Sequence, residues 1–310
     1  MTLVWPGTFT GGGDLPVADQ NSAKALLEEF ATRVAHHLAR LGLRELESPL
    51  WRPWNLVVVQ GPQNVFAAFS TFPGGMADVR WLDWRNLNPN AQGVVDAIRE
   101  QLGRKVDAAI TLPLPDAATK DIDIEVAAQS HAEDVERANR LGKVGDLTGV
   151  GHLEPYLREF LTEHPNYEKN VFVMMRFIAS PQLDEVYASI KSSLKERGFD
   201  AVRADDRDYT GELWSNVEVH LTGSKYGIAV FEDFAGVRDF NPNVSLELGY
   251  MVGRRKRVLI LKEQSLPALP ADVVHRLYKP FEMFNLSTSV SREVARWIDV
   301  DLGLGVGGRA

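Results

Sequence analysis

The chain has 310 residues, of which 45% are hydrophobic and 25% charged, a formal net charge of -8 at pH 7 and no cysteine. This length exceeds the usual range of one domain, so we expect two. The lack of cysteine excludes disulfides, thiolate catalysis and cysteine-ligated zinc, and the acidic balance argues against a general nucleic-acid binder, which needs clustered Lys and Arg.

The segment Met1–Gly7 has no basic stretch followed by an apolar one, so no signal peptide is expected. No run of about eighteen apolar residues occurs in the sequence, which predicts that no helix spans a membrane. With the absence of cysteine, these features predict a soluble, cytoplasmic protein that has no membrane partner.

The first part of the chain, residues 1–165, is predicted to be an α+β domain. Its expected elements are a helix over 21–42, strands over 55–60, 65–71 and 79–82, a helix over 91–102, a strand over 108–112, a loop over 114–121, and helices over 126–141 and 153–161. Asn21 or Ser22 can cap the first helix. Short links that contain Gly and Pro suggest that the first three strands form an antiparallel meander.

The same part of the chain is rich in aromatic residues. They are Trp51, Trp54, Phe66, Phe69, Phe72, Trp81 and Trp84. Such a group is more often the core of a small sheet than a ligand-binding face, and we favour the core.

A polar segment at residues 164–169 marks the predicted boundary to a second domain over 166–302, which a flexible tail over 303–310 follows. The expected elements are strands over 171–175, 199–203, 226–231, 258–261 and 279–282, and helices over 183–197, 212–222, 243–252, 271–277 and 289–298. Ser287 is one possible cap of the last helix. Five strand–helix alternations predict an α/β fold with a doubly wound, five-stranded parallel sheet and helices on both faces.

Polar residues follow four of these strands, and the ends of parallel strands converge on one ligand-binding edge. They are Arg176 and Phe177, then Asp205 to Tyr209, then Glu232 and Asp233 with Asn243 and Glu247, and finally Lys262 and Glu263. Glu247 lies one turn into a helix, where its carboxylate can hold a sugar while the helix N-terminus holds phosphate. The pattern therefore predicts a nucleotide or nucleoside site.

Several segments of the second domain occur in an order that is also seen in a known group of protein domains. They are Phe172–Phe177, Leu183–Tyr187, Val202–Asp206, Asn241–Val244 and Glu247–Tyr250. Over residues 170–285 the chain resembles bacterial TIR-like and nucleoside 2-deoxyribosyltransferase-like domains. It departs from their pattern at Arg176, where Pro is common, and in the loop Asp233–Phe240, which is several residues longer.

The resemblance implies a flavodoxin-like, TIR-like sheet and cleavage of an N-glycosidic bond, with Glu247 as the catalytic glutamate. A carboxylate suits this reaction because it stabilises, or attacks, the oxocarbenium character that forms on the sugar. Nicotinamide, while bonded to the ribose, is already a cationic leaving group and needs no general acid. A purine or pyrimidine would need a proton donor, for which Asp205, Asp206 and Asp233 are candidates.

The expected nucleotide-binding residues are Arg176, Phe177, Asp205, Asp206, Tyr209, Asp233, Asn243 and Gly249. Several of them also have a structural interpretation. Arg176 suits phosphate but equally a surface salt bridge, and Asn243 suits an N-cap, a ligand contact or both. Asp205 and Asp206 suit a solvated turn, and Gly249 suits close helix packing more than ligand contact.

Two further groups of residues are interpreted as structural. The run Arg254–Arg257 follows a helix C-terminus, where cations are favoured, so we expect solvated side chains rather than an anion site. The seven histidines have no metal-binding spacing, and no metal site is expected. Glu247 alone could be a glutamate that the helix dipole stabilises, but its flanking motif favours a functional role.

The sequence therefore predicts an enzyme that hydrolyses NAD or a related nucleotide, used as substrate with no cofactor. The resemblance suggests a bacterial anti-phage effector that forms a homo-oligomer, with a first domain that senses a nucleotide or protein activator or drives assembly. One alternative is a nucleoside 2-deoxyribosyltransferase or nucleoside hydrolase. Another is a non-catalytic nucleotide sensor or TIR-type scaffold.

Overall fold

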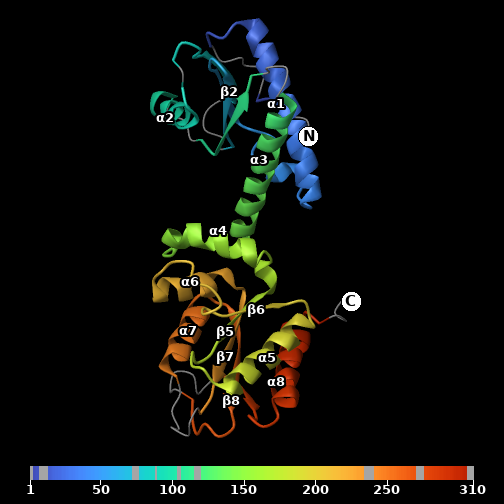
Figure 1. Ribbon diagram of the computed structural model, residues 1–310, viewed down its shortest axis with the longest axis vertical. Helices are drawn as coiled ribbons and strands as arrows, with labels where there is room; N and C mark the ends of the chain where they lie inside the picture. Colours follow the sequence, from blue (N-terminus) through green and yellow to red (C-terminus); the bar gives the residue numbers. More distant parts are fainter. Residues whose placement is uncertain are drawn as a thin grey trace. The chain divides into compact units, whose positions relative to one another are not determined.

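The computed structural model describes residues 3–6, 13–71, 77–87, 89–102, 106–114, 120–233, 241–269 and 276–305. The chain divides into two compact units, Met1–Asn139 and Arg140–Ala310 (Figure 1). The boundary expected at 164–169 falls inside the second unit, between helix α4 (Glu154–Glu163) and strand β5 (Asn170–Met174).

The first unit contains a four-stranded mixed sheet in the order β3-β1-β2-β4. Its elements are α1 (Val17–Arg40), the 3-10 turn η1 (Glu45–Glu47), β1 (Asn55–Gln60), β2 (Asn64–Ser70), β3 (Asp78–Asp83), α2 (Ala91–Leu102), β4 (Ala108–Pro113) and most of α3 (Lys120–Val144). The α+β prediction is therefore confirmed.

The predicted meander is wrong for its third strand. β1 and β2 form the expected antiparallel hairpin, but β3 pairs parallel with β1, and β4 pairs with the other edge of β2. Ser70 and Asp78 both pair with Asn55, on its two sides. The end of β2 and the start of β3 are therefore two strand spacings apart, about 10 Å. The seven residues that connect them can easily span this distance.

Helix α1 covers one face of this sheet. It begins directly after Pro16, four residues before the expected start, because the carbonyl of Pro16 accepts the first helical hydrogen bond, from the N–H of Gln20 at 2.9 Å. Neither proposed cap residue therefore caps it, and Ser22 donates a hydrogen bond to the carbonyl of Ala18 within the helix. The apolar side of α1, including Phe30 and Val34, packs against β1, β2 and β3.

Helix α2 is part of the core on the opposite face of the same sheet, where Val94 and Ile98 pack against Val57 and Phe66. Phe69 and Trp81 are buried on the α1 face. These aromatic residues are therefore core, as expected, while Phe72 lies outside the described residues.

The second unit contains a five-stranded sheet in the order β6-β5-β7-β8-β9, and all its pairs are parallel. Besides α4 and β5, its elements are η2 (Gly151–Leu153), η3 (Tyr167–Lys169), α5 (Pro181–Lys195), β6 (Asp200–Val202), α6 (Leu213–Gly223), β7 (Tyr226–Phe231), α7 (Pro242–Gly253), β8 (Arg257–Glu263), β9 (Lys279–Phe281), α8 (Leu286–Arg296) and the π-helical turn Trp297–Asp301. This strand order is that of flavodoxin-like folds, so the predicted fold class is confirmed.

Both faces of this sheet are buried, which is why its strands are almost continuously apolar. In β7, Ile228 and Val230 point toward α5 and α8, whereas Ala229 and Phe231 point toward α6 and α7. Figure 1 shows these two helix pairs on opposite faces of the sheet. A further helix, α4, packs against the outer side of α6 through Phe160.

Some predicted features differ from the structure, and others fall on residues outside the described ranges. Helix α8 follows Asn285, so Ser287 lies inside the helix and does not precede it. Residues 115–119 of the expected loop, 271–275 of the expected helix and 306–310 of the tail lie outside the described residues. None of the described helices combines the length and apolar composition that crossing a bilayer requires.

Candidate active site at the carboxyl-end edge of the parallel sheet

Glu247 lies on the side of α7 that faces the sheet. The buried residues of this helix are Val244, Glu247, Leu248 and Met251, a helical i, i+3, i+4, i+7 pattern. The helix begins at the carboxyl-end edge, and Pro242 at its first position pre-sets the helical φ. Glu247 therefore lies about one and a half turns in from this edge.

The carboxyl group of Glu247 is buried and incompletely bonded. Its residue is 4% exposed, and within the described part of the chain its Oε2 atom has no hydrogen-bond partner. Burial raises its pKa to about 7. A positive charge brought beside it would favour the ionised form, so the group is ready to respond to a cationic or electron-deficient ligand.

The cap of α7 is Asn241, whose side-chain oxygen accepts a hydrogen bond of 3.0 Å from the backbone N–H of Asn243. The N-cap interpretation of Asn243 is therefore wrong by two residues, and the Asn243 side chain is exposed at this edge. Gly249 is also exposed, and a Cβ atom added there would meet no atom within 4 Å. The close-packing interpretation of Gly249 is therefore wrong as well.

Arg176 and Glu232 lie at the ends of the adjacent strands β5 and β7. Arg176 Nε donates a hydrogen bond of 2.8 Å to Glu232 Oε1, and Glu232 is only 2% exposed. The Arg176 side chain is 29% exposed, and its two terminal nitrogens donate no hydrogen bond to the described residues. The ion-pair partner of Arg176 is thus a buried carboxylate rather than a surface one. The hydrogen bond to Glu232 orients the planar guanidinium group, whose two terminal nitrogens remain as donors.

Arg203, at the end of β6, connects three of the expected site residues. Its Nε donates a hydrogen bond of 2.8 Å to Asp205, and its backbone N–H donates one of 2.9 Å to Asp206. Its guanidinium carbon lies 5.6 Å from the ring centre of Phe177 and 4.7 Å from that of Tyr187. Arg203 was not among the residues expected at the site, although a cation two residues before an acidic run at a strand end is a detectable signal.

Two other expected residues lie apart from this group. Tyr209 is buried; its hydroxyl donates to Glu163 at 2.8 Å, and its ring contacts Phe160 and His220. Its ring belongs to the core beneath α4 and has no open face for a base. Asp233 is half-buried at the end of β7, next to residues 234–240, which lie outside the described residues.

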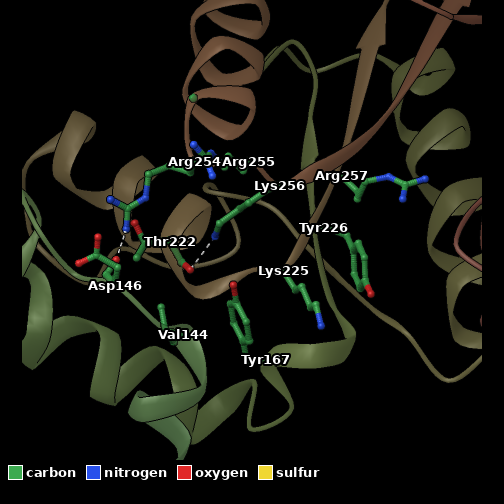
Figure 2. Close-up of a pocket in the computed structure, with 11 residues that line it drawn as sticks. Val144, Asp146, Tyr167, Thr222, Lys225, Tyr226, Arg254, Arg255, Lys256 and Arg257 are labelled. Carbon is green, nitrogen blue, oxygen red and sulfur yellow. Dashed lines mark hydrogen bonds between the residues drawn. The ribbon is translucent and has the colours of Figure 1, made fainter.

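A cavity of about 510 Å³ in the second unit lies at the opposite edge of the sheet (Figure 2). Its lining includes Tyr226 and Arg257, the first residues of β7 and β8, and none of the residues expected to bind nucleotide. Lys256 in its wall is largely buried and donates to three carbonyl oxygens. The expectation of a solvated basic run is therefore wrong for this residue.

Among the described residues, no group of three or more His, Asp or Glu side chains could hold a metal ion.

No protein-family model and no curated protein matches the chain.

Two solved structures share weak likeness with the chain. A 2-deoxyribosyltransferase from Bacillus psychrosaccharolyticus matches 38% of this chain and 90% of its own, at 14% identity and a TM-score of 0.28. The rubredoxin oxygen:oxidoreductase from Desulfovibrio gigas matches 63% of each chain, at 11% identity and a TM-score of 0.27. At these scores neither likeness bears on function.

Proposed function

We propose that the carboxyl-end edge of the parallel sheet binds a nucleotide and cleaves its N-glycosidic bond, with NAD as substrate and Glu247 as the catalytic carboxylate. The observation that carries the proposal is the buried, incompletely bonded carboxyl group of Glu247 at this edge. Burying such a group costs free energy, and strongly perturbed carboxyl groups concentrate where function uses them.

In the proposed reaction, the C–N bond between ribose and nicotinamide breaks, and its electron pair neutralises the pyridinium ring. The ribose gains oxocarbenium character, which ionised Glu247 stabilises or attacks before water completes the hydrolysis to ADP-ribose. Both the pyridinium ring and the oxocarbenium are positive. Bound substrate therefore favours the ionised form of a carboxyl group whose pKa is about 7 without ligand.

The neighbouring strand ends supply the proposed binding groups. Arg176, oriented by Glu232, offers its terminal nitrogens to a phosphate. We assign contacts with sugar hydroxyls to the exposed polar residues Asn243, Asp205 and Asp206 and to Asp233. The stack of Phe177 and Arg203 offers a surface for a base. Gly249 is exposed on the side of α7 away from Glu247, and we assign it no ligand contact.

One observation favours a second candidate, a nucleoside 2-deoxyribosyltransferase or nucleoside hydrolase. A purine or pyrimidine must be protonated as it leaves, and a pKa near 7 allows Glu247 to carry that proton in part of the molecules. In this reaction Glu247 would give its proton to the base and then attack or stabilise the sugar.

We assign a controlling role to the first unit, as a nucleotide-responsive or protein-responsive module, in an oligomeric anti-phage effector. Its support is that the unit has its own sheet and core. A reaction that consumes NAD also requires control, which a separate unit can provide.

The test is to incubate the full chain with NAD, alone and with cyclic nucleotides, and to measure free nicotinamide and ADP-ribose. We expect Glu247→Gln, which keeps the side-chain size and removes the charge, to lower the rate at least about 100-fold, as loss of an electrostatic catalyst does. Glu293→Gln is the matched control, because Glu293 is also buried but lies on α8 across the sheet.

Base exchange between deoxynucleosides, with NAD intact, would support the second candidate instead. Nucleotide binding without turnover, together with Glu247→Gln indistinguishable from the parent chain, would overturn both enzymatic proposals and favour a non-catalytic sensor.

A further inference from the structure

The cavity at the amino-end edge of the parallel sheet is strongly basic. Its lining residues are Val144, Asp146, Tyr167, Thr222, Lys225, Tyr226, Gly253, Arg254, Arg255, Lys256 and Arg257. Five of these side chains are cationic and one is acidic, in a chain whose net charge is -8. Figure 2 shows Arg254, Arg255 and Lys256 near the end of one helix, while the Arg257 side chain points away from them.

The end of α7 fixes Arg255 in an unusual backbone conformation. The N–H groups of Arg255 and Lys256 bond to the carbonyls of Val252 and Met251, each at 2.9 Å, which is the Schellman pattern. Arg255 therefore has a φ of 58°, and among the described residues no other non-glycine residue has a positive φ. Glycine is usual at this position, so an arginine is kept there at a cost of about 1 kcal/mol.

Two of the cations are held in place by neutral carbonyl groups. Lys256 Nζ donates to the carbonyls of Leu221, Thr222 and Ser224 at 2.6–2.9 Å. Arg254 donates to the carbonyls of Asp146 and Thr148 at 2.6 and 3.2 Å. These bonds position the positive charges without neutralising them.

The remaining cations differ in their partners. Lys225 pairs with Glu168, and Arg257 donates to the carbonyl of Asp301 at 2.9 Å. The Arg255 side chain is exposed and makes no hydrogen bond or ion pair within the described part of the chain. Arg255 is therefore the cation most available to a ligand.

A charge count shows that the cations of the site outnumber its anions. The run Arg254–Arg257 faces the Asp146 carboxylate and the ends of α6 and α7, each of which carries about half a negative charge. Burial and Arg254 lower the pKa of Lys256 to about 7, and an anion in the cavity would favour its protonated form. With Lys256 protonated, about two positive charges remain uncompensated by the described residues.

We propose that this cavity binds a compact anion that carries two or more phosphate groups, with Arg255 as its principal contact. The volume of about 510 Å³ suits a small molecule. The two aromatic residues of the lining, Tyr167 and Tyr226, are only 8% and 7% exposed, so neither offers an open ring face to a base, and recognition rests on phosphate. The inference goes beyond the proposed hydrolase because no lining residue belongs to the Glu247 edge.

The test is calorimetric titration of the full chain with inorganic pyrophosphate at fixed ionic strength. We expect saturable binding that Arg255→Gly weakens about tenfold or more, as loss of a charge-assisted contact does. Because glycine suits the positive φ, the same variant should unfold at an equal or higher temperature. Its loss of affinity therefore cannot come from misfolding.

Two controls accompany the titration. Arg52→Gln removes an exposed cation from the first unit and should bind pyrophosphate like the parent chain. Arg176→Gln should also bind pyrophosphate unchanged, which separates this site from the proposed active site, where Arg176 is the cation offered to phosphate. ADP should bind through Arg255, since it carries the same diphosphate group.

Three results would overturn the proposal. They are the absence of saturable pyrophosphate binding, equal affinity in the parent chain and Arg255→Gly, and much tighter Arg255-dependent binding of a single-stranded oligonucleotide. The last would identify a nucleic-acid surface instead.

Discussion

Arg176 and Glu232 join the ends of two neighbouring strands through a hydrogen bond of 2.8 Å between Nε and Oε1. The carboxylate is buried, whereas the arginine reaches solvent at the sheet edge. The pair thus places a partly exposed guanidinium above the central strands β5 and β7, where a phosphate of the substrate is proposed to bind.

Replacing Arg176 with Met should lower the free energy of unfolding by about 2–3 kcal/mol, because the buried Glu232 carboxylate loses an ion-pair partner. The double variant Arg176→Met/Glu232→Gln should be more stable than the sum of the single effects predicts. Urea denaturation of the four proteins measures this coupling. Strictly additive effects would show that the pair does not act as a unit.

Glu247 should make the second unit less stable as the pH rises. Its folded pKa of about 7 lies above its ordinary value of 4.5, so the folded state binds the proton more tightly between these values. Stability should fall from pH 4.5 to pH 7 by up to about 3 kcal/mol and then level off. Comparing the parent chain and Glu247→Gln by denaturation at pH 5 and pH 8 isolates this contribution. A difference that does not depend on pH would contradict it.

Gly223, the last residue of α6, should not tolerate a side chain. A Cβ atom there would lie within 2.5 Å of Cδ1 of Phe160, a fully buried residue of α4. Gly223→Ala should therefore lower stability by about 1–3 kcal/mol through overpacking. Gly249→Ala should instead raise stability, because its Cβ atom would meet no other atom within 4 Å and alanine favours a helix over glycine by about 1 kcal/mol. Thermal denaturation of both variants provides the comparison.

His131 should make the first unit sensitive to acid. It is buried beside Ser48, whose Oγ lies 3.1 Å from its Nε2, and burial lowers its pKa from 6.5 to about 4. Between these values the unfolded chain binds a proton that the folded chain does not. Stability is therefore complete above pH 6.5 and falls as the pH drops toward 4, by up to about 3 kcal/mol. His131→Gln should flatten this dependence, whereas the same change at exposed His36 should not.

The parallel sheet was predictable because its physical cause is local. Strands such as β7 are apolar at every position since both faces are buried, and strand–helix alternation leaves few topologies. The pairing of β3 with β1 was not predictable, because strand partners depend on the whole sheet and not on a local pattern. Likewise, the start of α1 depends on Pro16 more than on the polar residues that follow.

The candidate site was predictable in part. The strand-end rule placed Arg176 and Glu247 at one edge, but not the pairing of Arg176 with Glu232 or the part that Arg203 plays. The basic cavity was not predicted because its shape depends on the tertiary structure. Asp146 and Arg254 are more than a hundred residues apart in the chain, and one run of four cations looks the same in sequence whether it lies in water or in a cavity.

Helix α4 packs on α6 as an extra layer, with Phe160 against His220 and Tyr209. A recombinant fragment that began at residue 166 would lose this layer. Val219 would then become exposed, and the Tyr209 hydroxyl would lose its hydrogen-bond acceptor. A fragment that began near residue 140 would keep both. Anyone who wishes to crystallise the second unit alone should therefore cut the chain within α3, not at the polar segment before β5.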